Sequence, residues 1–383
     1  MRMLIDLQSM QSASGVRGIG KYVGSFVSEL CRRKGVEVTA ICNSALPECR
    51  LPDGLRDSAV LNLKGRRLPL HDSNNRFLWQ RASNAYVEFV AEHRFDYCLF
   101  PSFFEGFFDT VIYPEFSRLE VRTGAIHYDL IPLENPDSYL QHKLYRDFYL
   151  ARLDDLCRID QLFAISEDSR QSLYRNRLAV GEVYNIGAAV PVAPKAPEGM
   201  TPEEAGLLRR ILESKFIMSV GVFEPRKNLE LAVRAMRHVE DETVGLVLVC
   251  HQHDAQKALL FPGFEDIYPR IVLLPKLSDE ALEALYASAS AVVLPSMAEG
   301  FGLPVIEALA HGVPVAASDI PAHREILKNG KWLFDIDDAH ALADIVNRFL
   351  RGKGVAEQES LREKAREEYS WGRVVDRFLE GVK

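Results

Sequence analysis

Short apolar runs alternate with amphipathic stretches along most of this 383-residue chain. In the first half, apolar runs predict strands at 3–7, 36–42, 98–104, 122–129 and 160–166. After a polar loop, a helix is predicted from about Lys21 to Lys34. Its residues Tyr22, Phe26 and Leu30 recur at helical spacing. Strands that alternate with helices through short connections indicate a parallel, doubly wound sheet.

The alternation is interrupted once, near the middle of the chain. Residues 187–202 read GAAVPVAPKAPEGMTP, and four prolines among small residues predict an extended linker. Beyond the linker, strands are predicted at 216–222, 245–250, 271–275, 290–296 and 313–319. The sequence therefore predicts an α/β protein with two Rossmann-like domains, 1–190 and 200–369, that face each other across a cleft. A ligand is expected in the cleft, at the carboxyl ends of the strands.

Composition and charge narrow the class of protein. The chain is 47% hydrophobic and 26% charged, which is typical of a soluble globular protein. Its net charge of −8 argues against a nucleic-acid partner, which would favour a basic face. Residues 1–190 hold 23 Lys and Arg against 24 Asp and Glu, and the remainder holds 23 against 30. The relatively basic first half fits a solvated face or, alternatively, contact with a membrane surface.

Cysteines and apolar runs bear on the compartment. The six cysteines form no CxxC pair and have no neighbouring His at metal-ligand spacing. Most lie among apolar residues, which predicts buried free thiols. The opening MRMLIDLQS is typical of a strand rather than a signal peptide, and no apolar run reaches the ~18 residues of a membrane span. These features predict a cytoplasmic protein.

The most informative segment, residues 295–307, reads PSMAEGFGLPVIE. A predicted strand leads into a glycine-containing loop at a helix N-terminus, where backbone N–H groups suit a diphosphate. The residues expected to line this phosphate site are Gly300, Phe301, Gly302 and Leu303. Glu299 lies in the loop, where it can reach a ligand, and Glu307 lies about one turn into the helix, where it can bind a ribose hydroxyl pair. Alone, the two glutamates could be ordinary surface residues; the context favours a site.

A second segment, residues 221–228, reads GVFEPRKN and directly follows the predicted strand 216–222. Arg226 and Lys227 can neutralise two phosphate groups, the arginine as a planar fork and the lysine as a point charge. A solvated basic turn is the alternative interpretation. The strand–loop–helix setting favours phosphate binding.

Both segments resemble those of a known enzyme family. PSMAEGFGLPVIE is similar to the E-x7-E motif of retaining GT-B glycosyltransferases, specifically glycosyltransferase family 4. GVFEPRKN is similar to the G-x-x-E-P-R-K-N element of members that use GDP-mannose-like donors. Many relatives have a further Arg after the strand glycine, where this chain has Val222. The resemblance therefore implies that Arg226 and Lys227 carry the charge neutralisation and that Glu299 binds the donor sugar.

The resemblance extends over nearly the whole chain. Residues 17–22, RGIGKY, look like the G-I-G-R-Y loop, in which Gly18 and Gly20 let the backbone approach the donor; a tight turn is the alternative. Residues 126–132, IHYDLIP, resemble the H-D-x-x-P element, which implies that His127 contacts the donor sugar rather than being a core histidine. AISE at 164–167 resembles the V-S-x-x-S segment that borders the cleft. YSW at 369–371 resembles the closing segment, whose helix at about 370–383 joins the first domain.

The resemblance implies a reaction. The expected enzyme transfers mannose from GDP-mannose, or the related GDP-rhamnose, to a glycan or polyprenyl-linked oligosaccharide acceptor in cell-surface polysaccharide biosynthesis, such as O-antigen or lipopolysaccharide. Retention of anomeric configuration is implied, and in that scheme the departing phosphate can take the acceptor's proton, so no catalytic nucleophile is named. No metal or cofactor is expected, because cationic and dipolar groups of the protein can stabilise the leaving diphosphate. The base is expected against Lys276 and Leu277. A polyprenyl-linked acceptor would place the cytoplasmic protein peripherally on the membrane.

Rival interpretations remain. The donor could be a UDP- or dTDP-sugar, and a sugar-nucleotide epimerase or a phosphorylase would share the scaffold. A non-catalytic, sugar-nucleotide-binding subunit of a polysaccharide assembly complex is the alternative of another class. Two acidic segments are interpreted without a metal: residues 335–338, DIDD, as a helix N-cap, and Asp154 with Asp155 as exposed helix residues.

Overall fold

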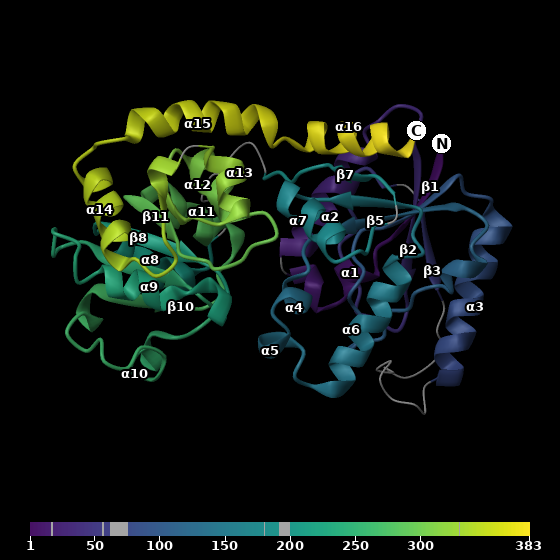
Figure 1. Ribbon diagram of the computed structural model, residues 1–383, viewed down its shortest axis with the longest axis horizontal. Coiled ribbons are helices and arrows are strands. Elements are labelled where there is room, and N and C mark those ends of the chain that lie inside the picture. Colours follow the sequence, from purple (N-terminus) through teal and green to yellow (C-terminus); the bar gives the residue numbers. More distant parts are fainter. Residues whose placement is uncertain (17, 56, 62–75, 180, 191–199, 329) are drawn as a thin grey trace. The chain divides into compact units, whose positions relative to one another are not determined.

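The computed structural model describes residues 1–383 apart from 17, 56, 62–75, 180, 191–199 and 329. Its contacts divide the chain into two units (Figure 1). The first unit contains Met1–Ala188 and Trp371–Lys383, and the second contains Ala189–Ser370. The boundaries predicted near 190 and 370 lie close to these. Most of the predicted linker falls outside the described residues.

A parallel sheet in the order β3-β2-β1-β4-β5-β6-β7 forms the centre of the first unit. The strands are β1 (Arg2–Asp6), β2 (Glu37–Asn43), β3 (Asp57–Leu61), β4 (Tyr97–Phe100), β5 (Arg122–His127), β6 (Gln161–Ala164) and β7 (Val183–Asn185). In register, Leu4 of β1 lies between Thr39 of β2 and Cys98 of β4. The strand order reverses between β1 and β4, and open α/β sheets bind ligands at such a reversal.

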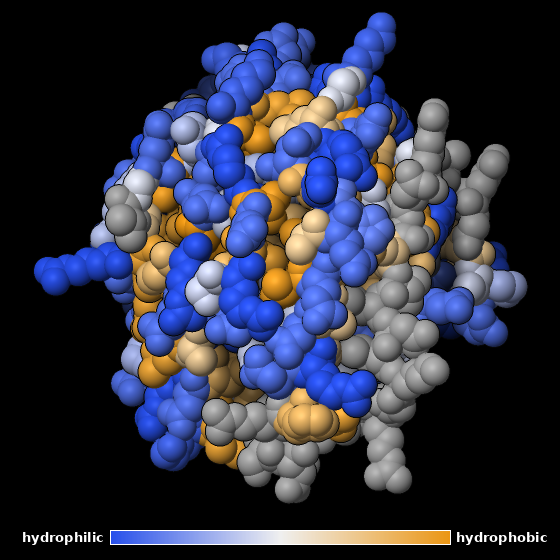
Figure 2. All heavy atoms as spheres, turned by 90° about the vertical axis from the view of Figure 1, so that its right-hand side faces the viewer, coloured by the Kyte–Doolittle hydropathy of each residue, from blue (hydrophilic) through white to orange (hydrophobic). Residues whose placement is uncertain are grey.

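Helices surround this sheet. They are α1 (Gln8–Gln11), η1 (Ala13–Val16), α2 (Gly18–Leu30), α3 (Arg76–His93), η3 (Phe116–Arg118), α4 (Ile131–Glu134), α5 (Pro136–Tyr139), α6 (Lys143–Leu156), α7 (Glu167–Arg175) and α16 (Trp371–Val382). Aromatic rings dominate the core, where Phe100, Phe103 and Phe116 pack with centroids 5.0–6.4 Å apart. Figure 2 shows one face of this unit, where apolar residues are visible between hydrophilic ones.

The C-terminal helix α16 belongs to the first unit and packs against α2 (Figure 1). The Phe378 ring meets Phe26 edge-on at 5.2 Å, and Trp371 meets Tyr22 at 5.0 Å. Gly381 lets the helix approach the sheet, because a Cβ there would lie 2.8 Å from the Phe163 ring. These buried aromatic contacts are the kind that hold a terminal helix in place.

The second unit has its own parallel sheet, in the order β10-β9-β8-β11-β12-β13. Its strands are β8 (Phe216–Val220), β9 (Gly245–Val249), β10 (Ile271–Leu274), β11 (Ala291–Leu294), β12 (Val315–Ser318) and β13 (Leu333–Phe334). The helices are α8 (Pro202–Leu212), η4 (Pro225–Lys227), α9 (Leu229–Ala235), η5 (Asp254–Gln256), α10 (Lys257–Leu260), η6 (Tyr268–Arg270), α11 (Asp279–Ser288), α12 (Leu303–His311), α13 (Pro321–Leu327), η7 (Gly330–Trp332), α14 (Ala339–Leu350) and α15 (Val355–Glu368). Its order reverses between β8 and β11.

The sequence predicted the strand cores better than their ends. The strand predicted at 98–104 stops at Phe100, because the apolar residues beyond it, such as Phe103, are buried in a loop. Three short strands were not predicted: β3, β7 and the two-residue β13. Cys42, Cys98 and Cys250 are buried as predicted, whereas Cys157 is exposed at the end of α6 and contradicts that prediction.

Candidate active site

The loop after β8 carries the two predicted phosphate-binding cations. It turns through η4, and Asn228, in the left-handed conformation, donates its side-chain amide to Ile336 O at 2.8 Å. The Lys227 side chain lies across Gly221, where a Cβ would be 3.0 Å from Lys227 Cε. The Arg226 carbonyl accepts a 2.7 Å bond from Met297 N in the loop after β11. The reversal of strand order therefore brings the two predicted motifs together.

Glu299 lies between the two cations rather than free in its loop. Its carboxylate accepts from Lys227 Nζ at 2.5 Å, from Arg226 Nη1 at 3.1 Å and from Ser296 Oγ at 2.6 Å. Arg226 also donates to Glu224 at 2.9 Å. The sequence predicted that Glu299 faces a ligand and that Arg226 and Lys227 bind phosphate. In this structure, the three charged side chains are instead paired with each other.

The ion pairs keep Glu299 ionised. The side chains of Lys227 and Glu299 are 11% and 12% exposed, so both charges are largely removed from water. Burial raises the pKa of Glu299, but the charges of Lys227 and Arg226, together with hydrogen bonds from Lys227 and Ser296, outweigh burial and lower that pKa to about 2. Two cations and two anions, counting Glu224, leave this cluster formally neutral.

The glycine loop ends where α12 begins. Gly302 adopts φ +97° directly before the helix, a conformation that favours glycine, and Pro304 lies in the first turn. Phe301 is buried against the Tyr369 ring at 5.5 Å, which anchors the loop in the core. The N–H groups of a first helical turn have no intrahelical partner, so this end of α12 suits an anion.

The remaining predicted residues of the second unit are more dispersed. Glu307 lies on α12 and accepts a 2.7 Å bond from the hydroxyl of buried Tyr286. Lys276 is exposed and Leu277 half-buried after β10, which is the edge strand on the other side of β9 from β8. Tyr286 thus orients the carboxylate expected to bind ribose.

In the first unit, His127 ends β5 and is 2% exposed. Neither ring nitrogen has a hydrogen-bond partner among the described residues. Burial lowers the pKa of His127 to about 3, so the ring is neutral near pH 7. The adjacent Tyr128 hydroxyl is also buried and lacks a partner in the described part of the chain. Buried polar groups normally have hydrogen-bond partners, so two unpaired polar side chains at the end of β5 are unusual.

Gly18 and Gly20 do not form the predicted loop. Helix α2 begins at Gly18, three residues before its predicted start, and both glycines lie in its first turns. A Cβ at Gly20 would overlap the Gly15 carbonyl, so the glycine is required where α2 passes η1. Close backbone packing, rather than a flexible turn, accounts for Gly20. Arg17 lies outside the described residues.

The AISE segment ties α7 to the residue after His127. Ser166 caps α7 by accepting from Ser169 N at 2.9 Å. Ser169 Oγ in turn donates to Tyr128 O at 2.5 Å. The serines of this motif therefore fix the backbone of the strand end that carries His127.

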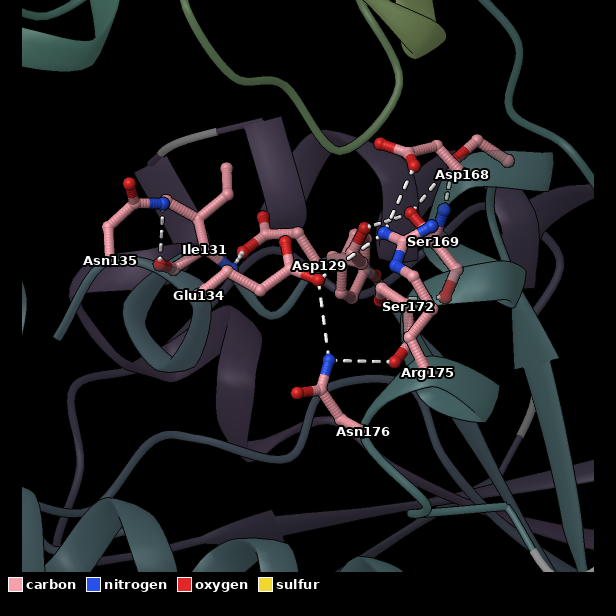
Figure 3. A network of polar contacts seen from close by, with 11 residues as sticks. Asp129, Ile131, Glu134, Asn135, Asp168, Ser169, Ser172, Arg175 and Asn176 are labelled. Atoms are coloured by element: carbon pink, nitrogen blue, oxygen red, sulfur yellow. Dashed lines mark hydrogen bonds and ion pairs between the residues drawn. The ribbon is translucent and has the colours of Figure 1, made fainter.

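Ion pairs between charged side chains connect α4, in the loop after β5, with α7 (Figure 3). Arg175 lies 3.3 Å from both Glu134 and Asp168, and the Asp129 carboxylate accepts from Ile131 N at 3.0 Å at the start of α4. In Figure 3, Arg175 points between the two carboxylates. These contacts position the loop after β5 without occupying His127.

The two acidic segments behave differently. Asp338 caps α14, accepting from Ala341 N at 2.9 Å, which confirms the predicted N-cap. Asp155 was predicted to be exposed, which is wrong: its side chain is 16% exposed and pairs with Arg152 and Arg158. Among the described residues, no group of three or more His, Cys, Asp or Glu could hold a metal ion.

Two residues that contact the predicted motif, Ser296 and His323, were not predicted. Ser296 could have been found from the P-S-x-x-E spacing. His323 offers no such signal: it lies on α13, is fully buried, and packs under Gly302, where a Cβ would be 3.1 Å from its ring.

Comparison with known proteins decides the family of the second unit. Residues 206–368 match the family described as Glycosyl transferases group 1. The second unit is a group 1 glycosyltransferase domain. Within the glycosyltransferase domain, the charge cluster and the glycine loop lie at the reversal of strand order between β8 and β11.

Curated relatives of this chain include mannosyltransferases. The chain is 27% identical over 408 residues to the serotype-specific mannosyltransferase WbdA of Escherichia coli, covering all of this chain and 48% of WbdA. It is 27% identical over 243 residues to the O-antigen chain mannosyltransferase RfbU of Salmonella typhimurium, covering 60% of this chain and 64% of RfbU. The chain thus spans about half the length of WbdA.

Solved structures share the fold over the whole chain. Sucrose-phosphate synthase of Thermosynechococcus elongatus superposes with a TM-score of 0.72 at 18% identity, covering 99% of this chain and 97% of that one. The lipopolysaccharide glycosyltransferase WaaG superposes with a TM-score of 0.64 at 13% identity, covering 96% and 95%. Both units therefore have the Rossmann-like form of GT-B glycosyltransferases. Among the described residues, no helix is long and apolar enough to cross a membrane.

Proposed function

We propose that this chain is a retaining mannosyltransferase that transfers mannose from GDP-mannose, or the related sugar from GDP-rhamnose, to a glycan in cell-surface polysaccharide biosynthesis. The cluster of Arg226, Lys227 and Glu299 at the reversal between β8 and β11 carries the proposal. The mannosyltransferase names of WbdA and RfbU, to which the chain is similar, support the choice of sugar.

The cluster would bind the donor by exchanging partners. In the structure, Glu299 is paired with both Arg226 and Lys227, and both cations lie within 3.1 Å of its carboxylate. A diphosphate would attract the same two cations and the N-terminus of α12. Glu299 would then be released to accept hydrogen bonds from the sugar hydroxyls, and Glu307 would bind the ribose.

These groups would act mainly on the leaving group. As the bond from the anomeric carbon to the phosphate breaks, negative charge grows on the diphosphate. Arg226, Lys227 and the first N–H groups of α12 would stabilise that charge, and preorganised stabilisation of this kind is usually the largest single contribution to catalysis. The departing phosphate would take the proton of the acceptor hydroxyl. The proposed mechanism requires neither a metal ion nor an enzyme nucleophile.

The first unit would contribute His127. Its neutral ring can donate one hydrogen bond and accept another, and both nitrogens lack partners among the described residues. Sugar hydroxyls offer both donors and acceptors, so a sugar could satisfy this ring. We propose in addition that the acceptor is a glycan or a polyprenyl-linked oligosaccharide and that the protein works in the cytoplasm, peripherally on the membrane.

A donor screen tests the proposal. Purified protein is incubated with GDP-mannose, GDP-rhamnose, UDP-glucose or dTDP-rhamnose, with and without mannooligosaccharide acceptors, in EDTA. We expect GDP release that depends on both GDP-mannose and an acceptor, with an α-linked product. Conversion of the donor without an acceptor would indicate an epimerase, and donor binding without turnover would indicate a non-catalytic subunit.

A further inference from the structure

A chain of hydrogen bonds connects Glu299 with the end of β12 and with α13. The Ser296 hydroxyl donates to Glu299 Oε1 at 2.6 Å, and the Ser296 carbonyl accepts from the hydroxyl of Ser318 at the end of β12. His323 Nδ1 lies 3.0 Å from Ser318 O and 3.2 Å from Ser318 Oγ. Ser296, Ser318 and His323 are at most 2% exposed.

The bonding pattern fixes the tautomer of His323. A backbone carbonyl can only accept, and the Ser318 hydroxyl proton is already directed at Ser296 O, so Nδ1 must carry a proton that both Ser318 oxygens accept. Burial lowers the pKa of His323 and outweighs the opposing effect of Glu299, so the ring is neutral. Nε2 is then unprotonated, is buried and has no partner among the described residues.

The same ring supports the glycine loop. A Cβ at Gly302 would lie 3.1 Å from His323 Cδ2 and 3.6 Å from Nε2, so the imidazole is in close contact with the residue that precedes α12. His323 is therefore connected to both parts of the site. It contacts Gly302 directly, and it is linked to Glu299 through Ser318 and Ser296.

We propose that His323 is a positioning residue of the donor site, which orders Glu299 through Ser318 and Ser296 and fixes the glycine loop through its contact with Gly302. The expected effect of His323 on the rate of transfer rests on the proposed function. The hydrogen-bonded chain itself is independent of which donor is used. His323 touches no reacting atom in this scheme, so its loss should misplace groups that bind the transition state rather than remove one.

Two substitutions of His323, with amide side chains of different length, distinguish this role from simple core packing. In His323→Asn the side-chain amide can take the place of Nδ1–H and still donate to Ser318, whereas in His323→Gln the amide reaches the position of Nε2 instead. With GDP-mannose as donor, we expect His323→Asn to retain kcat within about threefold. We expect His323→Gln and Ser318→Ala to lose about tenfold or more in kcat, with donor KM changed less than about threefold.

A stability measurement keeps the proposal testable if no transfer is found. The shifts in urea midpoint caused by Ser318→Ala and Glu299→Gln should not add in the double variant, because one bonded chain joins them. As a control, Ile211→Val, at a buried position of α8 in the same unit, should add with Glu299→Gln. Additive shifts for Ser318→Ala, or equal kcat losses for His323→Asn and His323→Gln, would overturn the proposal. Absence of transfer by the wild type with the coupling intact would overturn only the proposed function.

Discussion

The two units use related parallel sheets but finish their carboxyl edges in opposite ways. In the second unit, Lys227 and Glu299 are charged, buried and paired at 2.5 Å. In the first, the His127 ring and the Tyr128 hydroxyl are neutral and buried, and neither has a hydrogen-bond partner among the described residues. Both arrangements are costly to maintain unless a ligand uses them, because buried charges and buried unpaired polar groups each lose hydration.

The difference suits each unit to another part of the proposed donor. Paired charges can exchange one partner for another, which suits the binding of a diphosphate whose charge changes during reaction. Unpaired neutral groups can accept or donate hydrogen bonds without such an exchange, which suits sugar hydroxyls. Four changes should break or sharpen this contrast.

The largest effect is expected from Lys227→Ala. Removing this cation takes away a point charge next to the proposed diphosphate and leaves Glu299 with Arg226 alone. We expect kcat/KM for the donor to fall about 10³-fold, which corresponds to ~4 kcal/mol of transition-state stabilisation. Lys215→Ala, which removes an exposed lysine paired with Asp241, is the control and should leave the rate unchanged. Near-normal transfer by Lys227→Ala would remove the role given to the lysine.

A smaller loss is expected from Glu299→Gln. The amide can still meet sugar hydroxyls, but it no longer balances Arg226 and Lys227 before the donor binds. We expect kcat to fall about 100-fold, while the affinity for free GDP stays the same or rises, because the cations are no longer occupied. Weaker GDP binding, measured by calorimetry, would contradict the partner exchange.

Acid should affect the first unit through His127. Its pKa is about 3 in the folded protein and 6.5 ordinarily, so the unfolded chain takes up a proton between these values while the folded protein does not. The free energy of unfolding should therefore fall as pH drops below 6.5, by ~2 kcal/mol at pH 5 from this group. In His127→Leu that part of the pH dependence should vanish. The two proteins are compared by urea unfolding from pH 8 to 5; parallel curves would show that the ring titrates normally.

The smallest effect belongs to Glu299 and appears at lower pH. Its folded pKa of about 2 lies below the ordinary 4.5, so its contribution to stability is complete above 4.5 and is lost as pH falls towards 2. The loss should be ~1.4 kcal/mol at pH 3.5. The stability difference between wild type and Glu299→Gln should accordingly narrow between pH 5 and 3.5. A constant difference would mean that the ion pairs do not hold the carboxylate ionised.

The sequence predicted much of the second unit because its site is local. Glu299, Gly302 and Glu307 lie within nine residues, and the strand and helix on either side have clear apolar patterns. The ion pairing of these residues was not predictable in the same way. Nothing in the order of residues shows that Lys227 lies against Glu299, 72 positions later, since the reversal of strand order brings them together.

The first unit was harder for a related reason. Gly18 and Gly20 matched a loop motif, but contact with Gly15 sets the role of Gly20, and helix α2 begins earlier than its apolar stripe indicates. The burial of His127 and the fixing of its strand end by Ser169 depend on packing between elements 40 residues apart. Such packing leaves no periodic signal.

Calorimetric titration of the 383-residue chain with GDP tests the central claim most directly. The account holds that Arg226, Lys227 and the N-terminus of α12 bind a nucleoside diphosphate. It predicts saturable 1:1 binding by the wild type without added metal, at least tenfold weaker binding by Lys227→Ala, and unchanged binding by Lys215→Ala. Failure of the wild type to bind GDP or any other nucleoside diphosphate, or equal binding by Lys227→Ala, would contradict it.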